Sequence, residues 1–296
     1  MLKSGIQNIL TIDVEEYFHP TEVQRVVGME RWSSLPSLVE RQTSEVLDLL
    51  DKHSVRATCF VLGWVAEKYP SLVRKIAAAG HEIACHSYAH QLVYDLTPRH
   101  FRQDTQRAVA AIADATGEPP RAYRAPSYSI TARSLWALEI LIECGMHCDS
   151  SIYPIAHDRY GIPGFERHAH VMPTPSGPIL EVPVATTRLS YGAIAPVGGG
   201  AYLRLLPYRY TAAGIRRINA SEELPACIYF HPWEIDPEHP RLTQGVASRF
   251  RTYSGLRGMR SKLERLLRDF RFSTIASVYP AEKLIHEKSM SSAAAT

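Results

Sequence analysis

The sequence predicts an α/β fold with parallel strands, and it favours a (β/α) barrel over an open sheet. Short apolar runs of strand character alternate with segments whose apolar residues recur at helical spacing. This strand, helix, strand rhythm indicates parallel strands that are joined by helical crossovers. Six or more such units favour a closed arrangement, and the absence of an internal repeat or a linker favours one domain.

The first half of the chain carries this rhythm clearly. Strands are expected over residues 7–12, 56–62, 82–85, 122–125 and 147–149. Helices are expected over residues 37–53, 71–79, 97–117 and 134–144. The third helix has distinct boundary signals, because Thr97 suits the N-cap, Pro98 suits the first turn and Gly117 suits the end.

The rhythm changes after residue 150. Residues 153–178 contain several proline and glycine residues, too many for regular structure, and are expected to form a long surface excursion. The three consecutive glycines at 198–200 open the segment 201–207. Further strands are expected over 179–184, 226–230 and 271–278, with a last helix over 261–270. We therefore expect one domain over residues 1–288, with a core at 7–150, a C-terminal part at 151–288 and a disordered tail at 289–296.

Composition excludes several classes of protein. The chain has 296 residues, of which 45% are hydrophobic and 21% are charged, as in ordinary globular domains. Its formal net charge of +3 comes without a basic run, so a nucleic-acid partner is not expected. No apolar run is long enough for a transmembrane segment or a signal-peptide core, so a cytoplasmic location is expected. Five cysteines without a close pair predict free thiols rather than a disulfide framework.

The most informative motif is His-Ser-Tyr-Ala-His over residues 86–90, directly after an expected strand. A spacing of four places His86 and His90 on one side of a helical turn, where both rings can bind one metal ion. A zincin-type protease is disfavoured, because Ser87 stands where that motif has its glutamate. Two histidines alone are weak evidence for a metal site, so the acidic cluster near the N-terminus matters.

That acidic cluster, residues 13–16, also follows an expected strand. Asp13 and Glu15 point to the same side of this strand, whereas Val14 points into the core. One acid can bind the metal while the other acts as general base. With His86 and His90 this gives three protein ligands and one open position, the arrangement of a catalytic zinc-type site. The pattern predicts a metal-dependent hydrolase.

Other residues could complete the chemistry. His231 ends an apolar run and suits a proton donor to the leaving group, although a packed core histidine is the alternative. Arg124 ends a short strand, where it could pair with a catalytic carboxylate or form a plain surface ion pair. Aromatic residues that could form sugar-stacking walls, or else ordinary packing, are Tyr128, Tyr153, Tyr202, Tyr208 and Trp233.

These motifs together resemble the polysaccharide deacetylase family, the NodB-homology group or carbohydrate esterase family 4. The resemblance is strong over residues 7–150 and recurs at His231. The segment 198–208 resembles the C-terminal extension of a bacterial subgroup that is linked to exopolysaccharide production and exosortase systems. The motifs that carry the resemblance are Thr-Ile-Asp-Val-Glu at 11–15, His-Ser-Tyr-Ala-His at 86–90, Arg-Ala-Pro-Ser at 124–127, Asp-Ser-Ser at 149–151 and Phe-His-Pro at 230–232.

The resemblance implies a distorted (β/α) barrel with fewer than eight repeats and a divalent metal, most commonly Zn²⁺. It also implies a carbohydrate substrate, from whose amino sugars an N-acetyl group is hydrolysed. Backbone N–H groups near Ser127 would help to hold the oxyanion. Carried over by position, the general base is Asp13, the metal ligands include His86 and His90, the residue that tunes the base is Arg124, the general acid is His231, and an acid that orients this histidine is Asp149.

One departure from the family pattern affects the third ligand. The family usually has two adjacent aspartates, the second on the metal, whereas Val14 occupies that place here and the acid moves to Glu15. Glu16 and His19 are the alternative third ligands. The same variant pattern occurs in relatives that cleave other amides, so a hydrolase of a cyclic amide or ureide, similar to allantoinase, is the second hypothesis.

The second hypothesis would be favoured by a closed site walled by residues 153–178, and the first by an open groove. A non-catalytic binding component is a third hypothesis, disfavoured because a pure binder needs no base and acid pair. Two histidines and a carboxylate also accept cobalt, nickel, manganese or iron in place of zinc. The sequence does not indicate an oligomeric state.

Overall fold

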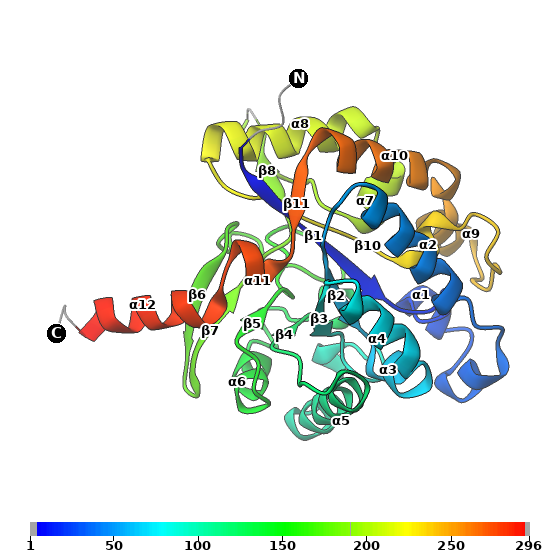
Figure 1. Ribbon diagram of the computed structural model, residues 1–296, viewed down its shortest axis with the longest axis horizontal. Coiled ribbons are helices and arrows are strands. Elements are labelled where there is room, and N and C mark those ends of the chain that lie inside the picture. Colours follow the sequence, from blue (N-terminus) through cyan, green and yellow to red (C-terminus); the bar gives the residue numbers. More distant parts are fainter. Residues whose placement is uncertain (1–4, 190, 294–296) are drawn as a thin grey trace.

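A nine-stranded, mostly parallel sheet forms the centre of the protein, seen in a computed structural model that describes residues 5–189 and 191–293 (Figure 1). The strand order is β10-β1-β2-β3-β4-β5-β7-β6, and β11 pairs with β1. Every pairing in this sheet is parallel except β6 with β7. The sheet curves without closing, so the predicted distorted (β/α) barrel is confirmed as an open one. Its strands are β1 (Gln7–Val14), β2 (Thr58–Val61), β3 (Glu82–Cys85), β4 (Ala122–Tyr123), β5 (Cys148–Asp149), β6 (His170–Thr174), β7 (Gly177–Glu181), β10 (Cys227–Phe230) and β11 (Arg271–Ser273).

Helices surround this sheet (Figure 1). The third long helix that the sequence predicts has the expected ends, because Thr97 Oγ1 accepts a hydrogen bond from the His100 N–H and Gly117 takes a left-handed φ of 87°. No described helix is long and apolar enough to cross a bilayer. The α-helices are α1 (Thr21–Gln24), α2 (Val39–Lys52), α3 (Gly63–Lys68), α4 (Pro70–Ala78), α5 (Pro98–Thr116), α6 (Trp136–Glu143), α7 (Gly200–Leu205), α8 (Tyr208–Arg217), α9 (Val246–Tyr253), α10 (Leu256–Asp269), α11 (Ile275–Val278) and α12 (Ala281–Ala293).

Strand β1 lies between β10 and β2 and is buried along almost its whole length. Leu10, Ile12 and Val14 join the main apolar core, which includes Val46 and Leu50 of α2. Each such side chain contributes roughly 1.5–3 kcal/mol when it leaves water. Side chains alternate along a strand, so burial of Ile12 and Val14 in this core directs Asp13, which lies between them, to the opposite face of the sheet. The packing of β1 thus positions the acid at its end.

Three expectations for the C-terminal half need correction. The excursion 153–178 does contain a strand, β6, and its proline is tolerated because β6 lies at the sheet edge. The strand expected over 271–278 ends at Ser273, because Thr274 caps α11 by accepting a hydrogen bond from the Ser277 N–H. The tail expected from residue 289 is helical as far as Ala293, and residues 294–296 lie outside the described residues.

The three glycines at 198–200 allow the start of α7 to lie directly on Tyr229 of β10. Gly199 has a φ of +72°, and a Cβ there would come within 2.1 Å of the Tyr229 ring. A small antiparallel ribbon precedes these glycines in the chain and is formed by β8 (Thr186–Arg188) and β9 (Ile194–Pro196). The glycine run is therefore explained by a close approach between backbone and ring.

We expect Gly199→Ala to lower the free energy of unfolding by about 2–4 kcal/mol, because the methyl group overlaps the ring and the backbone is left-handed. Gly258→Ala is the matched control, since a Cβ there meets no atom within 4 Å. Urea unfolding of both variants measures the difference. Equal stability of the two variants would contradict the packing explanation.

Candidate metal centre and catalytic site

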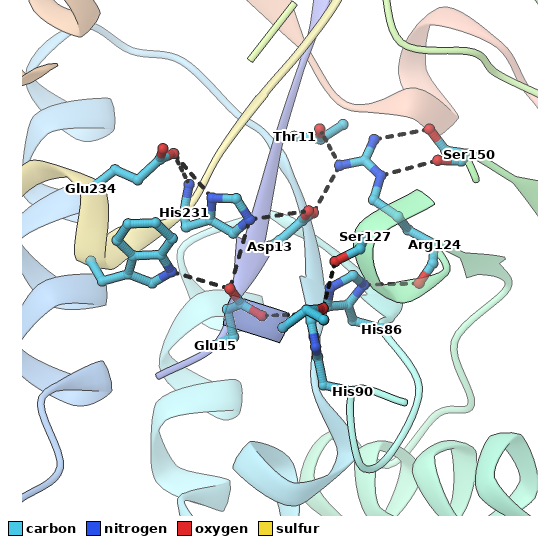
Figure 2. Close-up of polar contacts among 12 residues, drawn as sticks. Thr11, Asp13, Glu15, His86, His90, Arg124, Ser127, Ser150, His231 and Glu234 are labelled. Atoms are coloured by element: carbon cyan, nitrogen blue, oxygen red, sulfur yellow. Dashed lines mark hydrogen bonds and ion pairs between the residues drawn. The ribbon is translucent and has the colours of Figure 1, made fainter. Parts of the chain in front are cut away.

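The predicted site residues meet at the carboxyl ends of the parallel strands (Figure 2). Asp13 lies in β1, His86 directly follows β3, Arg124 directly follows β4 and His231 directly follows β10. Neighbouring parallel strands present their carboxyl ends at one edge, where ligands bind in α/β proteins. Residues far apart in the sequence are thereby brought within a few ångströms.

Glu15, His86 and His90 form the candidate metal site. Their ligand atoms all lie within 4.8 Å of one another, and all three side chains are buried. His90 Nε2 is 3.0 Å from a carboxylate oxygen of Glu15. His86 Nδ1 is 2.8 Å from the carbonyl oxygen of Arg124, which can only accept, so the proton is on Nδ1 and the Nε2 lone pair is free.

The protonation states of Glu15 and His86 suit a cation. Burial lowers the pKa of His86 to about 4, so this ring is neutral at physiological pH. Burial would favour the neutral form of Glu15, but the nearby imidazoles, above all that of His90, hold its pKa below the ordinary value. A carboxylate with two imidazoles and one open position is the donor set of a catalytic zinc-type centre.

The histidine motif converges for a different reason from the one that its spacing suggested. Residues 86–90 form a loop after β3 rather than a helical turn, and Ser87 and His90 take φ values of 61° and 50°. On α5, the carboxylate of Asp104 accepts hydrogen bonds from the backbone N–H groups of residues 88 and 89, at 2.8 and 3.1 Å. This anchor turns the loop so that the two histidine rings lie 5.3 Å apart.

The two alternative third ligands are engaged elsewhere. The Glu16 carboxylate accepts hydrogen bonds from the Ser37 hydroxyl and from backbone N–H groups at the start of α2. His19 Nδ1 accepts a hydrogen bond from the Glu16 N–H at 3.0 Å, and its ring packs against Trp32 and Trp64. Glu16 therefore acts as a helix cap and His19 as a core residue.

Asp13 is held by a buried arginine. Arg124 Nη1 donates to Asp13 Oδ1 at 2.8 Å and to the Thr11 hydroxyl at 2.7 Å. The same guanidinium binds the carbonyl and hydroxyl oxygens of Ser150, at 3.1 and 2.9 Å. Four hydrogen bonds leave this side chain little freedom, so the second carboxylate oxygen of Asp13 is directed into the site (Figure 2).

His231 lies across the site from the two other histidines. Its Nε2 is 3.8 Å from Asp13 and 3.7 Å from Glu15, and its Nδ1 is 3.0 Å from Glu234. Burial alone would lower the pKa of His231, but the negative charge of Glu234, with smaller contributions from Glu15 and Asp13, raises it to about 9. The ring is therefore a cation at neutral pH, the form that a proton donor requires.

Two further residues, Trp233 and Glu234, support His231. The sequence did not predict these contacts. The Trp233 ring stacks on His231 with centroids 5.0 Å apart, and its indole N–H donates to Glu15 at 3.1 Å. Glu234 also binds Arg204 at 2.5 Å. A carboxylate three residues after the histidine, in His-Pro-Trp-Glu, was the available signal, because it forms a capping box over one turn.

The prediction that Asp149 orients the catalytic histidine is wrong, since Glu234 occupies that place. Asp149 instead accepts a hydrogen bond from the Ser151 hydroxyl at 2.5 Å, and this hydroxyl accepts one from the Ala125 N–H at 2.7 Å. Asp149 is paired in register with Glu181 of β7 and interacts with its carboxyl group. It therefore supports the segment that carries Arg124.

Glu181 and Asp149 form a buried carboxyl pair. Burial raises the pKa of both groups, and the charge of Asp149 raises that of Glu181 further, which favours the protonated form of Glu181. The folded protein then binds more protons than the unfolded chain at any pH between the two values for Glu181. The free energy of unfolding must fall as pH rises above the ordinary glutamate value of 4.5.

We expect Glu181→Gln to remove this fall, because the amide stays neutral and can still donate to Asp149. The free energy of unfolding of the variant should rise relative to that of the wild type as pH rises from acidic to alkaline. The rise is at most about 1.4 kcal/mol for each pH unit. Thermal unfolding across this pH range measures the gain. The exposed Glu118→Gln is the control, and a difference in stability between variant and wild type that is constant with pH would contradict the raised pKa of Glu181.

A cavity of about 300 Å³ opens above the candidate metal site. Ser127, near which an oxyanion donor was expected, lines this cavity with a φ of +50°. The excursion supplies one wall, where the His157 and Tyr160 rings stack with centroids 3.8 Å apart and Arg159 pairs with Glu22 at 2.5 Å. Three of the five aromatic residues that were predicted to stack on sugars line the cavity, namely Tyr128, Tyr202 and Trp233. Of the other two, Tyr153 packs behind the cavity and Tyr208 binds Asp269.

An open (β/α) barrel with two histidines and a carboxylate at its carboxyl edge is the arrangement of a NodB-like domain. Comparison with known families agrees with this interpretation. The polysaccharide deacetylase family matches residues 34–147, and a domain of unknown function, DUF3473, matches residues 150–280. Residues 34–147 therefore match the polysaccharide deacetylase family, and the C-terminal part of the chain matches this second domain.

Curated relatives match a part of the chain. A peptidoglycan-N-acetylglucosamine deacetylase of Bacillus cereus is 35% identical over 98 residues, which are 33% of this chain and 36% of that protein. A chitooligosaccharide deacetylase of a Bradyrhizobium species is 36% identical over 100 residues, 33% of this chain and 43% of that protein. The chain thus spans less than half the length of these relatives.

Solved structures share the fold over nearly the whole chain. A putative polysaccharide deacetylase from Mycobacterium smegmatis has a TM-score of 0.61 at 17% identity. The matched region covers 97% of this chain and 94% of that protein. An allantoinase also reaches a TM-score of 0.61 at 16% identity, covering 92% and 88%. At these identities the likeness concerns the fold alone.

Proposed function

We propose that the protein is a metal-dependent deacetylase that hydrolyses N-acetyl groups from amino sugars of a bacterial polysaccharide. The observation that carries this proposal is the convergence of the Glu15, His86 and His90 set with Asp13 and His231 at one edge of the sheet. The relatives named as deacetylases of peptidoglycan and of chitooligosaccharides support an N-acetylated saccharide as substrate. A role in exopolysaccharide production is part of the same proposal.

A divalent cation, zinc in this proposal, fits the three ligands and would supply Lewis-acid activation of water and of the amide carbonyl. Asp13 accepts a proton from the attacking water, since its free oxygen faces the site while Arg124 holds the other. His231 donates its proton to the amide nitrogen as the C–N bond breaks. One water and one amide thus become acetate and a free amine, and Glu234 stabilises the His231 cation before donation.

The experiment is to measure acetate release from N-acetylglucosamine oligomers and from a bacterial exopolysaccharide. Elemental analysis defines the bound metal, and chelation followed by zinc addition tests its need. His86→Ala should lose both metal and activity, whereas His100→Ala, on the exposed start of α5, should keep both. Folded, metal-loaded wild type that releases no acetate from any saccharide would overturn the proposal.

A cyclic amide or ureide is the second candidate substrate class, and one feature of the cavity supports it. The wall formed by His157, Arg159 and Tyr160 belongs to residues 153–178, which would favour a small cyclic amide if they closed the site. Ring-opening of allantoin by the same metal-loaded protein, without acetate release from saccharides, would assign the site to that class. A purely binding role would require unchanged ligand binding in Asp13→Asn together with no metal in the purified protein.

A further inference from the structure

An exposed patch on helix α9 has no role in the proposed chemistry. We define the α9 patch as Arg241, Val246, Arg249 and Phe250, which line one shallow depression. Val246 is 86% exposed and Phe250 is 59% exposed. These two residues are four apart on the helix and therefore lie on the same face. Two large apolar side chains that stay in water side by side indicate a surface that another phase or molecule covers.

The α9 patch itself carries two cations, Arg241 and Arg249, and no carboxylate. Residues 239–263 contain no aspartate or glutamate. Within the described residues, Arg241, Arg249 and Arg257 have no carboxylate partner, although Arg241 lies over the Tyr253 ring. This segment is therefore a local concentration of positive charge in a chain whose formal net charge is only +3. Two other cations of the segment are neutralised, because Arg251 pairs with Glu22 and Asp158 and Arg260 pairs with Glu45. The cations of the segment are Arg241, Arg249, Arg251, Arg257, Arg260 and Lys262.

The α9 patch lies beside the mouth of the catalytic cavity. Arg251 and Thr252, the residues that directly follow the patch in α9, line this cavity. Leu205, another partly exposed apolar residue, lines the same rim. Figure 1 shows α9 at the periphery, on the side toward which β1 points. Whatever binds the patch therefore lies next to the entrance of the site.

We infer that the α9 patch docks the protein on an anionic lipid surface, with the cavity mouth beside the headgroups. Arginine side chains bind lipid phosphates, and an aromatic ring enters the interface between headgroups and acyl chains. Val246 decides between this partner and an acidic polysaccharide, because an aliphatic side chain gains stability in an acyl environment and very little on a hydrated sugar chain. This inference goes beyond the proposed deacetylase activity.

Co-sedimentation with vesicles tests the inference on the full chain. Wild type should bind vesicles of phosphatidylcholine mixed with phosphatidylglycerol and not vesicles of phosphatidylcholine alone. Arg241→Gln with Arg249→Gln should weaken binding about thirtyfold, and Val246→Ser with Phe250→Ser at least about tenfold. Phe250→Trp gives a direct readout, since acyl-chain-brominated lipid should quench the added fluorescence.

Matched controls separate the patch from general effects of charge and polarity. Arg74→Gln with Arg99→Gln removes two exposed cations from α4 and α5, and Leu135→Ser with Met290→Ser removes exposed apolar groups elsewhere. Both controls should bind as wild type does. Thermal unfolding checks the fold of every variant, so the result is independent of any deacetylase activity.

Three outcomes would overturn the inference. The first is wild type that does not bind anionic vesicles at low salt, and the second is patch variants that bind them as tightly as wild type. The third is binding of polygalacturonate that the patch variants weaken while vesicle binding is unchanged, which would assign the patch to an acidic polysaccharide.

Discussion

Replacing Glu15 by glutamine should remove the bound metal and reduce acetate release by more than about a hundredfold, because loss of a direct ligand exceeds the loss of a supporting contact. The amide has the same shape as the carboxylate but no negative charge, and it would lie between His90 and Trp233, which contact the two oxygens of Glu15. Elemental analysis and acetate release measure the two effects.

The adjacent Glu16→Gln is the sharpest control for this result. Glu16 caps α2 through Ser37 and Leu38, so its replacement should lower stability while metal content and the rate per folded molecule are retained. Loss of a cap interaction typically lowers the free energy of unfolding by about 1 kcal/mol. Metal loss in Glu16→Gln with retention in Glu15→Gln would reverse the ligand assignment.

Asp13→Asn should reduce the rate of acetate release by about a hundredfold to ten-thousandfold while the metal stays bound. The asparagine can still contact Arg124 through its amide oxygen, so the local geometry is kept and proton acceptance is lost. The rate at saturating substrate, with metal content measured on the same sample, checks this prediction.

Asp149→Asn is the matched control, because Asp149 is a buried acid of the same sheet that contacts Ser151 rather than the site. It should reduce the rate less than Asp13→Asn and less than Glu234→Gln, which removes the charge beside His231. A larger loss in Asp149→Asn than in Glu234→Gln would restore the role that the sequence assigned to Asp149.

Much of the fold followed from local patterns. The alternation of apolar runs and helical spacing predicted the strands β1 to β5 and the helices α2, α4, α5 and α6 between them, but not the short helices α1 and α3. Thr97 and Gly117 marked the ends of α5 correctly. The C-terminal half was harder, because β6 is an edge strand with proline and because α12 is held by Leu284 and Ile285 against a core cluster that its own sequence does not reveal.

The candidate site divides in the same way. Asp13, His86 and His231 each follow or end an apolar run, so their meeting at one edge was predictable from parallel strands. The loop form of residues 86–90 was not, since it depends on Asp104, which lies on another element. The sequence also did not indicate which acid near His231 contacts its ring, because Glu234, Asp236 and Glu238 all follow it closely.

The sequence by itself determined the α/β class, the strand ends that carry chemistry and the kinds of ligand available, because these depend on side-chain type and on periodicity along one segment. Only the tertiary structure decided that Glu15 joins the histidines while Glu16 caps a helix, and that Glu234 rather than Asp149 holds His231. Such choices depend on distances between separate elements, which change by several ångströms with small differences in packing and have no counterpart in a one-dimensional pattern.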